Sequence, residues 1–103
     1  MNRLDDKVAL ITGGARGQGA AEAELFVAAG AQVVITDVLD DEGETTATRL
    51  GDACEYLHQD VTSEHEWTSI IDDVVSRHGG LDVLVNNAGI FKMAGLDETS
   101  LAV

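Results

Sequence analysis

The chain has 103 residues, which is short for more than one domain, and its 45% apolar content is ordinary for a globular protein. A formal net charge of −13 argues against nucleic acid or an anionic membrane as a partner, because both require clustered Lys and Arg. No apolar run reaches the length of a membrane span and residues 1–6 lack a signal peptide's apolar core, so the sequence predicts a cytoplasmic protein.

The cysteine and histidine residues indicate neither a disulfide nor a metal site. Cys54 is the single cysteine, so it cannot form an internal disulfide, and we expect it to be a small buried side chain in a strand. His58, His65 and His78 share no ligand spacing, and no metal site is predicted from them.

Four apolar runs predict strands, at residues 8–12, 32–36, 54–59 and 81–85. The first run is apolar throughout, which is typical of a central strand in a parallel sheet. The third run is more polar, as an edge strand is.

Helix-patterned segments separate these strands. The first covers residues 18–29 and ends at a glycine. Its apolar positions recur at helical spacing and predict the inward face: Ala21, Leu25, Ala28 and Ala29. The second begins with acidic residues at 40–42, carries Ala47 and Leu50 inward, and also ends at a glycine.

The third helix has the clearest pattern. Ser63 and Glu66 form a capping box, in which Ser63 caps the helix and the Glu66 side chain is expected to reach back to Ser63. Apolar residues then follow at helical spacing: Trp67, Ile70, Ile71, Val74 and Val75. At that spacing we expect Trp67 to be a core residue rather than a stacking platform for a ligand.

Strict alternation of strands and helices with short connections indicates a parallel sheet with right-handed crossovers. The simplest arrangement has strand order 3-2-1-4, which is the N-terminal half of a Rossmann-type, doubly wound α/β fold. Ligands of such sheets bind beyond the carboxyl ends of the strands. The residues that follow each strand are therefore the candidates for a binding site.

A glycine-rich loop, Gly-Gly-Ala-Arg-Gly-Gln-Gly at residues 13–19, follows the first strand. Gly13, Gly17 and Gly19 permit a sharp turn and leave the backbone open to a pyrophosphate, while the next helix directs its N–H groups and positive dipole end there. Arg16 and Gln18 lie in the same loop. A turn without a ligand is the alternative, since the spacing is not G-x-G-x-x-G and no Lys-Ser or Lys-Thr pair follows.

Asp37 ends the second strand, 18 residues after Gly19. At that spacing an acidic side chain can accept hydrogen bonds from the adenosine ribose of a dinucleotide, although an ordinary turn residue is the alternative. The extra phosphate of NADP would be repelled by roughly 4 kcal/mol per unit charge at about 4 Å. Arg16 could offset part of this repulsion. The sequence therefore favours NAD over NADP as the cofactor.

Two further segments follow the third and fourth strands. Asp60 could accept from the adenine amino group while Val61 packs on the ring, but a strand-end Asp more often caps a turn. Residues 86–89 read Asn-Asn-Ala-Gly, whose amides could lock adjacent strands and whose small residues leave room for a nucleoside. From this segment we assign Asn87, Ala88 and Gly89 to the candidate site.

Together the loop, Asp37, the Asp-Val pair and the Asn-Asn-Ala-Gly segment resemble the N-terminal half of the short-chain dehydrogenase/reductase family, over residues 7–89. Residues 11–17 and 36–40 look most like bacterial hydroxysteroid dehydrogenases of the 3α/20β type, and related members reduce 3-oxoacyl chains on acyl carrier protein. The resemblance implies an NAD-dependent oxidoreductase that transfers a hydride between nicotinamide and a secondary alcohol or ketone. It also implies a small-molecule substrate and a dimeric or tetrameric protein.

The family's catalytic Tyr-x-x-x-Lys unit cannot be placed in this chain. Tyr56 is the only tyrosine, and Asp60 rather than Lys lies four residues after it. The resemblance therefore implies that residues 1–103 are the NAD(P)-binding half-domain, without the catalytic half, and that the fourth strand is left as an open edge. A dinucleotide-binding module without catalysis stays open as an alternative, as does another glycine-rich α/β domain such as a methyltransferase.

Overall fold

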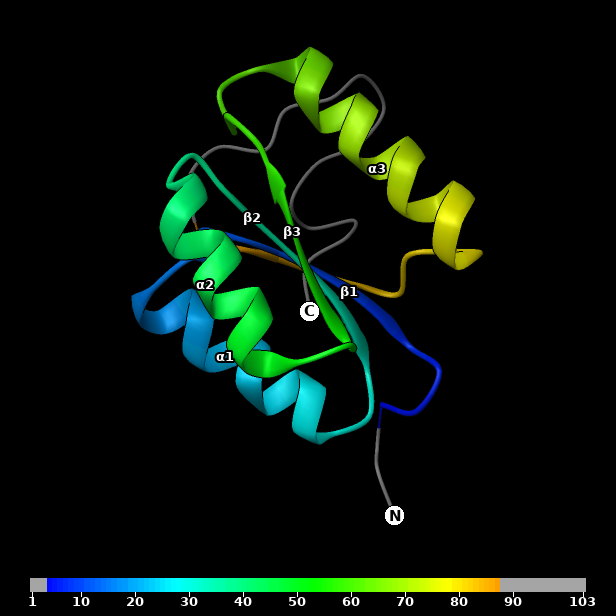
Figure 1. Cartoon of the computed structure of the whole chain (residues 1–103). Coiled ribbons are helices and arrows are strands. Elements are labelled where there is room, and N and C mark those ends of the chain that lie inside the picture. The colour runs from blue at the N-terminus through cyan, green and yellow to red at the C-terminus, as the bar shows by residue number, and fades with distance from the viewer. Residues whose placement is uncertain (1–3, 88–103) are drawn as a thin grey trace.

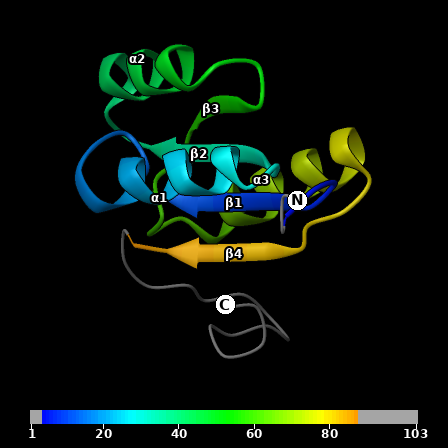
Figure 2. The same cartoon turned by 90° about the horizontal axis from the view of Figure 1, so that it is seen from below.

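A computed structural model describes residues 4–87 and shows a parallel sheet with helices on both faces (Figure 1). The elements are β1 (Val8–Thr12), α1 (Gly17–Ala28), β2 (Gln32–Asp37), α2 (Asp40–Leu50), β3 (Cys54–His58), α3 (Glu64–His78) and β4 (Val83–Asn86). The strand order is β3-β2-β1-β4, so the predicted Rossmann-type α/β fold is confirmed. Figure 2 shows the strands in this order, with β3 and β4 at opposite edges.

The register of the sheet brings the carboxyl ends of its strands to one edge. Thr12, the last residue of β1, pairs with Thr36 in β2 and with Asn86 in β4. Asp37 pairs with His58 at the end of β3. The segments that leave the four strands therefore start side by side.

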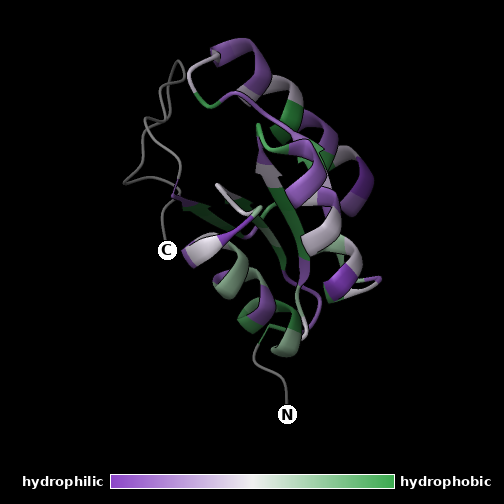
Figure 3. Cartoon of the chain, turned by 60° about the vertical axis from the view of Figure 1, so that its left-hand side comes forward, coloured by the Kyte–Doolittle hydropathy of each residue, from purple (hydrophilic) through white to green (hydrophobic). Residues whose placement is uncertain are grey.

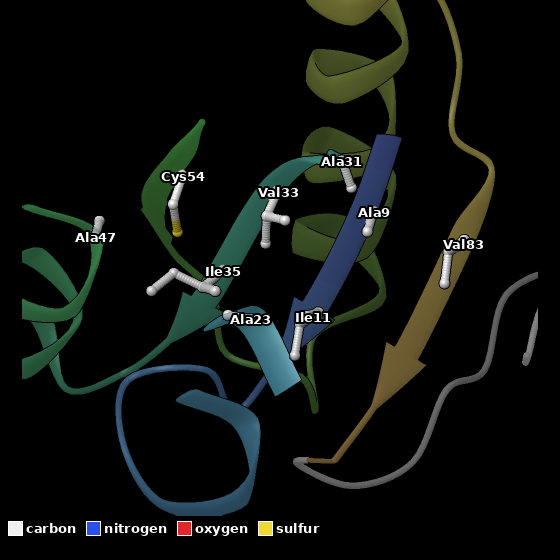
Figure 4. Packing of buried hydrophobic residues seen from close by; sticks show 9 residues of the cluster. All are labelled: Ala9, Ile11, Ala23, Ala31, Val33, Ile35, Ala47, Cys54 and Val83. Atoms are coloured by element: carbon white, nitrogen blue, oxygen red, sulfur yellow. The ribbon is translucent and has the colours of Figure 1, made fainter. Parts of the chain in front are cut away.

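Two apolar clusters hold the layers together. One lies between the sheet and helices α1 and α2, and Figure 4 shows its members: Ala9, Ile11, Ala23, Ala31, Val33, Ile35, Ala47, Cys54 and Val83. The other lies under α3 and includes Trp67, which is buried as predicted. Figure 3 shows mostly hydrophobic residues along the strands and many hydrophilic residues along the helices. Cys54 is buried, and burial raises the pKa of its thiol to about 11.

The predicted inward face of the first helix is wrong. Leu25 is 69% exposed, and Ala21 and Ala28 are exposed too. Ala20 and Ala23 are the buried apolar residues of α1 instead. Alanine occurs around most of this helix, so the periodicity of apolar residues had little contrast from which to choose a face.

The predicted capping box is only half formed. The Ser63 hydroxyl accepts from the Glu66 N–H at 3.2 Å, as expected. The Glu66 carboxylate, however, accepts from the Asp60 N–H at 2.8 Å rather than from Ser63, whose own N–H donates to the Asp60 carbonyl. The turn at residues 60–63 thus bonds within itself, and Glu66 fastens the end of β3 to α3.

The edge strand β3 is joined to the start of α2 by an ion pair. His58 Nδ1 lies 2.8 Å from Asp40 Oδ1, and this contact raises the pKa of the imidazole. Hydrogen bonds from Tyr56 and His58 lower the pKa of the Asp40 carboxyl. The pair therefore stabilises the fold at pH values between the ordinary pKa of a carboxyl and that of an imidazole. Its contribution to stability disappears as the pH rises through the raised pKa of His58.

We expect Asp40→Asn to bring the pKa of His58 back down toward its ordinary value, because the partner charge is lost. Titration of the His58 ring followed by NMR measures this change. Asp41→Asn removes the neighbouring carboxylate, for which no contact with His58 is observed, and serves as the control. An equal His58 pKa in both variants would contradict the assigned ion pair.

Candidate functional site

The structure places the candidate residues along one edge of the sheet. The glycine-rich loop follows β1, Asp37 ends β2, Asp60 and Val61 follow β3, and Asn87 follows β4. Ala88 and Gly89, the remaining candidates, lie outside the described residues.

The loop after β1 has the backbone shape that its glycines predict. Gly13 and Gly17 have φ values of 66° and 60°, in the left-handed region that favours glycine. A Cβ on Gly19 would lie 2.0 Å from the Gly13 carbonyl oxygen, so only glycine lets α1 begin this close to the loop. Gly14 was not predicted as a candidate, yet a Cβ there would lie 2.6 Å from the Cβ of Ile35. The first close approach is between α1 and the loop, and the second is between the loop and β2.

The N-terminus of α1 has no side-chain cap. Its N-cap residue, Arg16, makes no capping hydrogen bond, and no acidic residue lies in the first turn. In contrast, Ser63 caps α3. The first N–H groups of α1 therefore have no side-chain acceptor within the helix start, which is the arrangement that suits a bound anion.

The side chains of Arg16 and Gln18 lie at the surface beside this loop. The Arg16 guanidinium lies 3.7 Å from the Glu42 carboxylate in α2. Gln18 donates to Glu22 at 3.4 Å, one turn along α1. The observed contacts of both side chains are thus with the acidic residues Glu42 and Glu22.

Asp37 contacts the glycine-rich loop directly. Its Oδ2 accepts from the Ala15 N–H at 3.2 Å, and its Oδ1 accepts from the N–H groups of Val38 and Leu39 at 2.8 and 3.2 Å. These backbone donors hold the carboxylate at the loop, and Oδ2, which accepts a single bond, keeps a lone pair for a further donor. The side chain on which the NAD prediction depends is therefore beside the candidate phosphate site.

Val38 is an apolar surface residue that the sequence prediction missed. It is 55% exposed and follows Asp37 directly. An exposed aliphatic side chain beside a polar site offers a surface on which a flat ring can pack. Its signal in the sequence was an apolar residue immediately after a strand-end carboxylate.

Asp60 caps a turn in the structure. Its Oδ1 accepts from both the N–H and the hydroxyl of Thr62, at 2.9 and 2.6 Å, and these bonds lower the pKa of the carboxyl. Val61 packs against the cluster under α3, and its carbonyl accepts from the Trp67 indole at 2.8 Å. The alternative role of Asp60 as a turn residue is thus observed, while its contact with adenine stays a prediction.

Thr12 connects the ends of β1 and β4. Its buried hydroxyl donates to Asn86 Oδ1 at 2.8 Å and accepts from the Asn87 N–H at 3.1 Å. The Asn87 side chain donates to Glu22 in α1. The predicted role of the asparagines in locking adjacent strands is seen in these bonds.

The surroundings of the loop are acidic. An open hollow of about 340 Å³ is lined by Ala15, Asp41, Glu42, Thr45 and Thr46. The acidic residues were predicted only as a helix start, because their proximity to the loop depends on where α2 packs. Such an acidic lining would repel the extra phosphate group of NADP.

The residues 4–87 contain no group of three His, Cys, Asp or Glu side chains placed to hold a metal ion. In the same part of the chain, no helix is both long and apolar enough to span a membrane.

Known proteins match this chain over most of its length. The family model described as short chain dehydrogenase matches residues 7–102. A 3-alpha-(or 20-beta)-hydroxysteroid dehydrogenase of Mycobacterium tuberculosis is 50% identical over 99 residues, which are 96% of this chain and 38% of that protein. Tropinone reductase-like 2 of Erythroxylum coca is 51% identical over 94 residues, 91% of this chain and 34% of that protein.

A solved structure also matches. The crystal structure of 3-ketoacyl-(acyl-carrier-protein) reductase from Brucella melitensis complexed with NADH has a TM-score of 0.79 and 40% sequence identity, over 84% of this chain and 36% of that one. The chain thus spans little more than a third of the length of the proteins it matches. With the family model covering nearly all of its residues, the chain belongs to the short-chain dehydrogenase family.

Proposed function

We propose that this chain is the dinucleotide-binding part of an NAD-dependent short-chain oxidoreductase, with residues 1–103 as the NAD(P)-binding half-domain. The observation that carries the proposal is the contact between the Asp37 carboxylate and the Ala15 N–H at 3.2 Å. It puts a fixed anionic acceptor beside an uncapped helix N-terminus and a glycine-rich loop. That combination suits the ribose and the diphosphate of one dinucleotide.

The residues present fit such a cofactor. The loop with Gly13, Gly17 and Gly19 would hold the diphosphate on backbone N–H groups, since a Cβ at Gly19 cannot be accommodated. Asp37 would accept from the ribose hydroxyls, and Val38 with Val61 would border the adenine. When bound, the nicotinamide supplies the hydride acceptor or donor for a secondary alcohol or ketone.

The charge around the site supports NAD rather than NADP. Asp37 lies beside the glycine-rich loop, where it would accept from the ribose, and Asp41 and Glu42 line the adjacent hollow. Arg16 could compensate an added phosphate, but it already lies 3.7 Å from Glu42. The extra phosphate of NADP would therefore enter a region of net negative charge.

The proposed substrate class is supported by the relatives alone. The relative named for hydroxysteroids is 50% identical to this chain and supports a hydroxysteroid or similar secondary alcohol as the substrate. A 3-oxoacyl thioester is the second candidate, because the matched solved structure is a 3-ketoacyl-(acyl-carrier-protein) reductase. The remaining alternative is a protein that binds the dinucleotide without catalysing a reaction.

Titration of the purified protein with NADH and with NADPH, followed by nicotinamide fluorescence, tests the cofactor. We expect tighter binding of NADH, and we expect Asp37→Ala to weaken NADH binding roughly ten- to a hundredfold, as for the loss of hydrogen bonds to a charged group. Asp52→Ala removes an exposed carboxylate at the opposite end of β3 and is the matched control. Equal affinity for both cofactors in the unaltered protein would remove Asp37 from the proposed role.

Substitution of Gly19 by Ala tests the loop. The added Cβ would overlap the Gly13 carbonyl oxygen, so loop and helix must separate, and we expect NADH affinity to fall by at least about tenfold. Gly80→Ala is the control, because its Cβ meets no atom within 4 Å. Thermal unfolding of both variants separates loss of the site from loss of the fold. Normal NADH binding by a folded Gly19→Ala protein would exclude this loop as the diphosphate site.

Steady-state assays on the full-length protein, in which this half-domain is joined to the catalytic half that the family resemblance implies, distinguish the substrate classes. We expect a higher kcat/KM for oxidation of a hydroxysteroid with NAD than for reduction of a 3-oxoacyl thioester with NADH, measured as NADH absorbance. The reverse order would favour the acyl substrate. NADH binding without turnover of either compound would favour the non-catalytic alternative.

A further inference from the structure

Thr46 makes an unusual contact for a threonine inside a helix. Its hydroxyl donates to the Ala15 carbonyl at 2.6 Å, far along the chain, and both residues are buried. The neighbouring Thr45 makes the common local bond instead, to the Asp41 carbonyl of its own helix at 2.9 Å. Thr46 therefore ties α2 to the glycine-rich loop.

The Ala15 residue is held from both sides. Its N–H donates to the Asp37 carboxylate at 3.2 Å, and its carbonyl accepts from Thr46. The loop orientation is thus set jointly by the end of β2 and by α2. The two contacts hold the two successive peptide groups on either side of the Ala15 Cα.

Tyr56 holds the segment that carries Asp37. Its hydroxyl lies 2.8 Å from the Asp37 carbonyl oxygen and also bonds to the Asp40 carboxylate, so one proton faces two acceptors. Burial, followed by the bond to Asp40, raises the pKa of Tyr56, and the phenol stays a donor. The ring packs against α2 at Gly43, where a Cβ would lie 2.2 Å from Cε1 of the ring.

We propose that Thr46 and Tyr56 are positioning residues for cofactor selection. Thr46 fixes the glycine-rich loop, and Tyr56 fixes the turn from β2 into α2, so that Asp37 meets the ribose in one orientation. The inference rests on the proposed function. An acceptor discriminates between a hydroxyl and a phosphate only while its position is fixed, since a mobile carboxylate can turn away from the added charge.

The test compares Thr46→Val and Tyr56→Phe, which remove the two hydroxyls and keep the side-chain shapes, in titrations with NADH and with NADPH. We expect each variant to bind NADH about fivefold more weakly, the usual effect of one hydrogen bond, with little change for NADPH. The ratio of the NADH affinity to the NADPH affinity therefore falls. Thr46→Ser should restore it, and Thr68→Val, whose hydroxyl bonds to the Glu64 carbonyl in α3, should leave it unchanged.

Hydrogen exchange of the Ala15 amide in the protein without cofactor gives an independent readout. We expect faster exchange at Ala15 in Thr46→Val, and no change for the amides of α3. Equal loss of NADH and NADPH binding together with faster exchange throughout the protein would indicate a general stability effect and overturn the inference.

The two proposals fail in different ways. Unchanged cofactor preference in both variants, with normal NADH binding by the unaltered protein, overturns the inference alone. An unaltered protein that binds neither dinucleotide overturns the proposed function, and the inference with it.

Discussion

The contact between Asp37 and the Ala15 N–H depends on the parallel register of β1 and β2. Because Thr12 pairs with Thr36, the two strands end within one residue of each other, and Ala15 in the loop after β1 meets Asp37 at the end of β2. One strand continues into the glycine-rich loop, and the other ends in a carboxylate. A slip of the register by one residue would move the Asp37 side chain to the other face of the sheet and separate these groups.

Helix α2 contributes to this site as much as to the core. Ala47 packs into the apolar cluster, and Thr46, one position earlier, reaches the loop. Its first turn supplies the acidic residues that line the hollow beside Ala15. The packing of α2 therefore places both the Thr46 hydrogen bond to the loop and the acidic residues beside it.

At the ends of β1 and β4, the candidate site is held by hydrogen bonds between the two strands. Thr12, Asn86 and Asn87 join β1 to β4 through side-chain and backbone hydrogen bonds. Because the Thr12 hydroxyl is buried, these bonds satisfy a polar group that has no access to water. These bonds therefore join β4 to the end of β1, where the glycine-rich loop begins.

The amino-acid sequence by itself determined the alternation of strands and helices, the strand order and the loop glycines. These depend on local signals: apolar runs, glycines at turns and the capping Ser63. It also indicated Asp37, because the spacing from the loop reflects one strand-helix-strand unit. These predictions needed no knowledge of how distant side chains meet.

Only the tertiary structure decided the buried face of α1, the partner of Glu66 and the contacts of Thr46 and Tyr56. An alanine-rich helix has little contrast between its faces, so packing against β1 and β2 selects the inward one. Glu66 had two backbone donors within reach, and the local turn already supplied an acceptor for Ser63. The bonds of Thr46 and Tyr56 join residues distant along the chain, and such pairs come together only when α2 docks on the sheet.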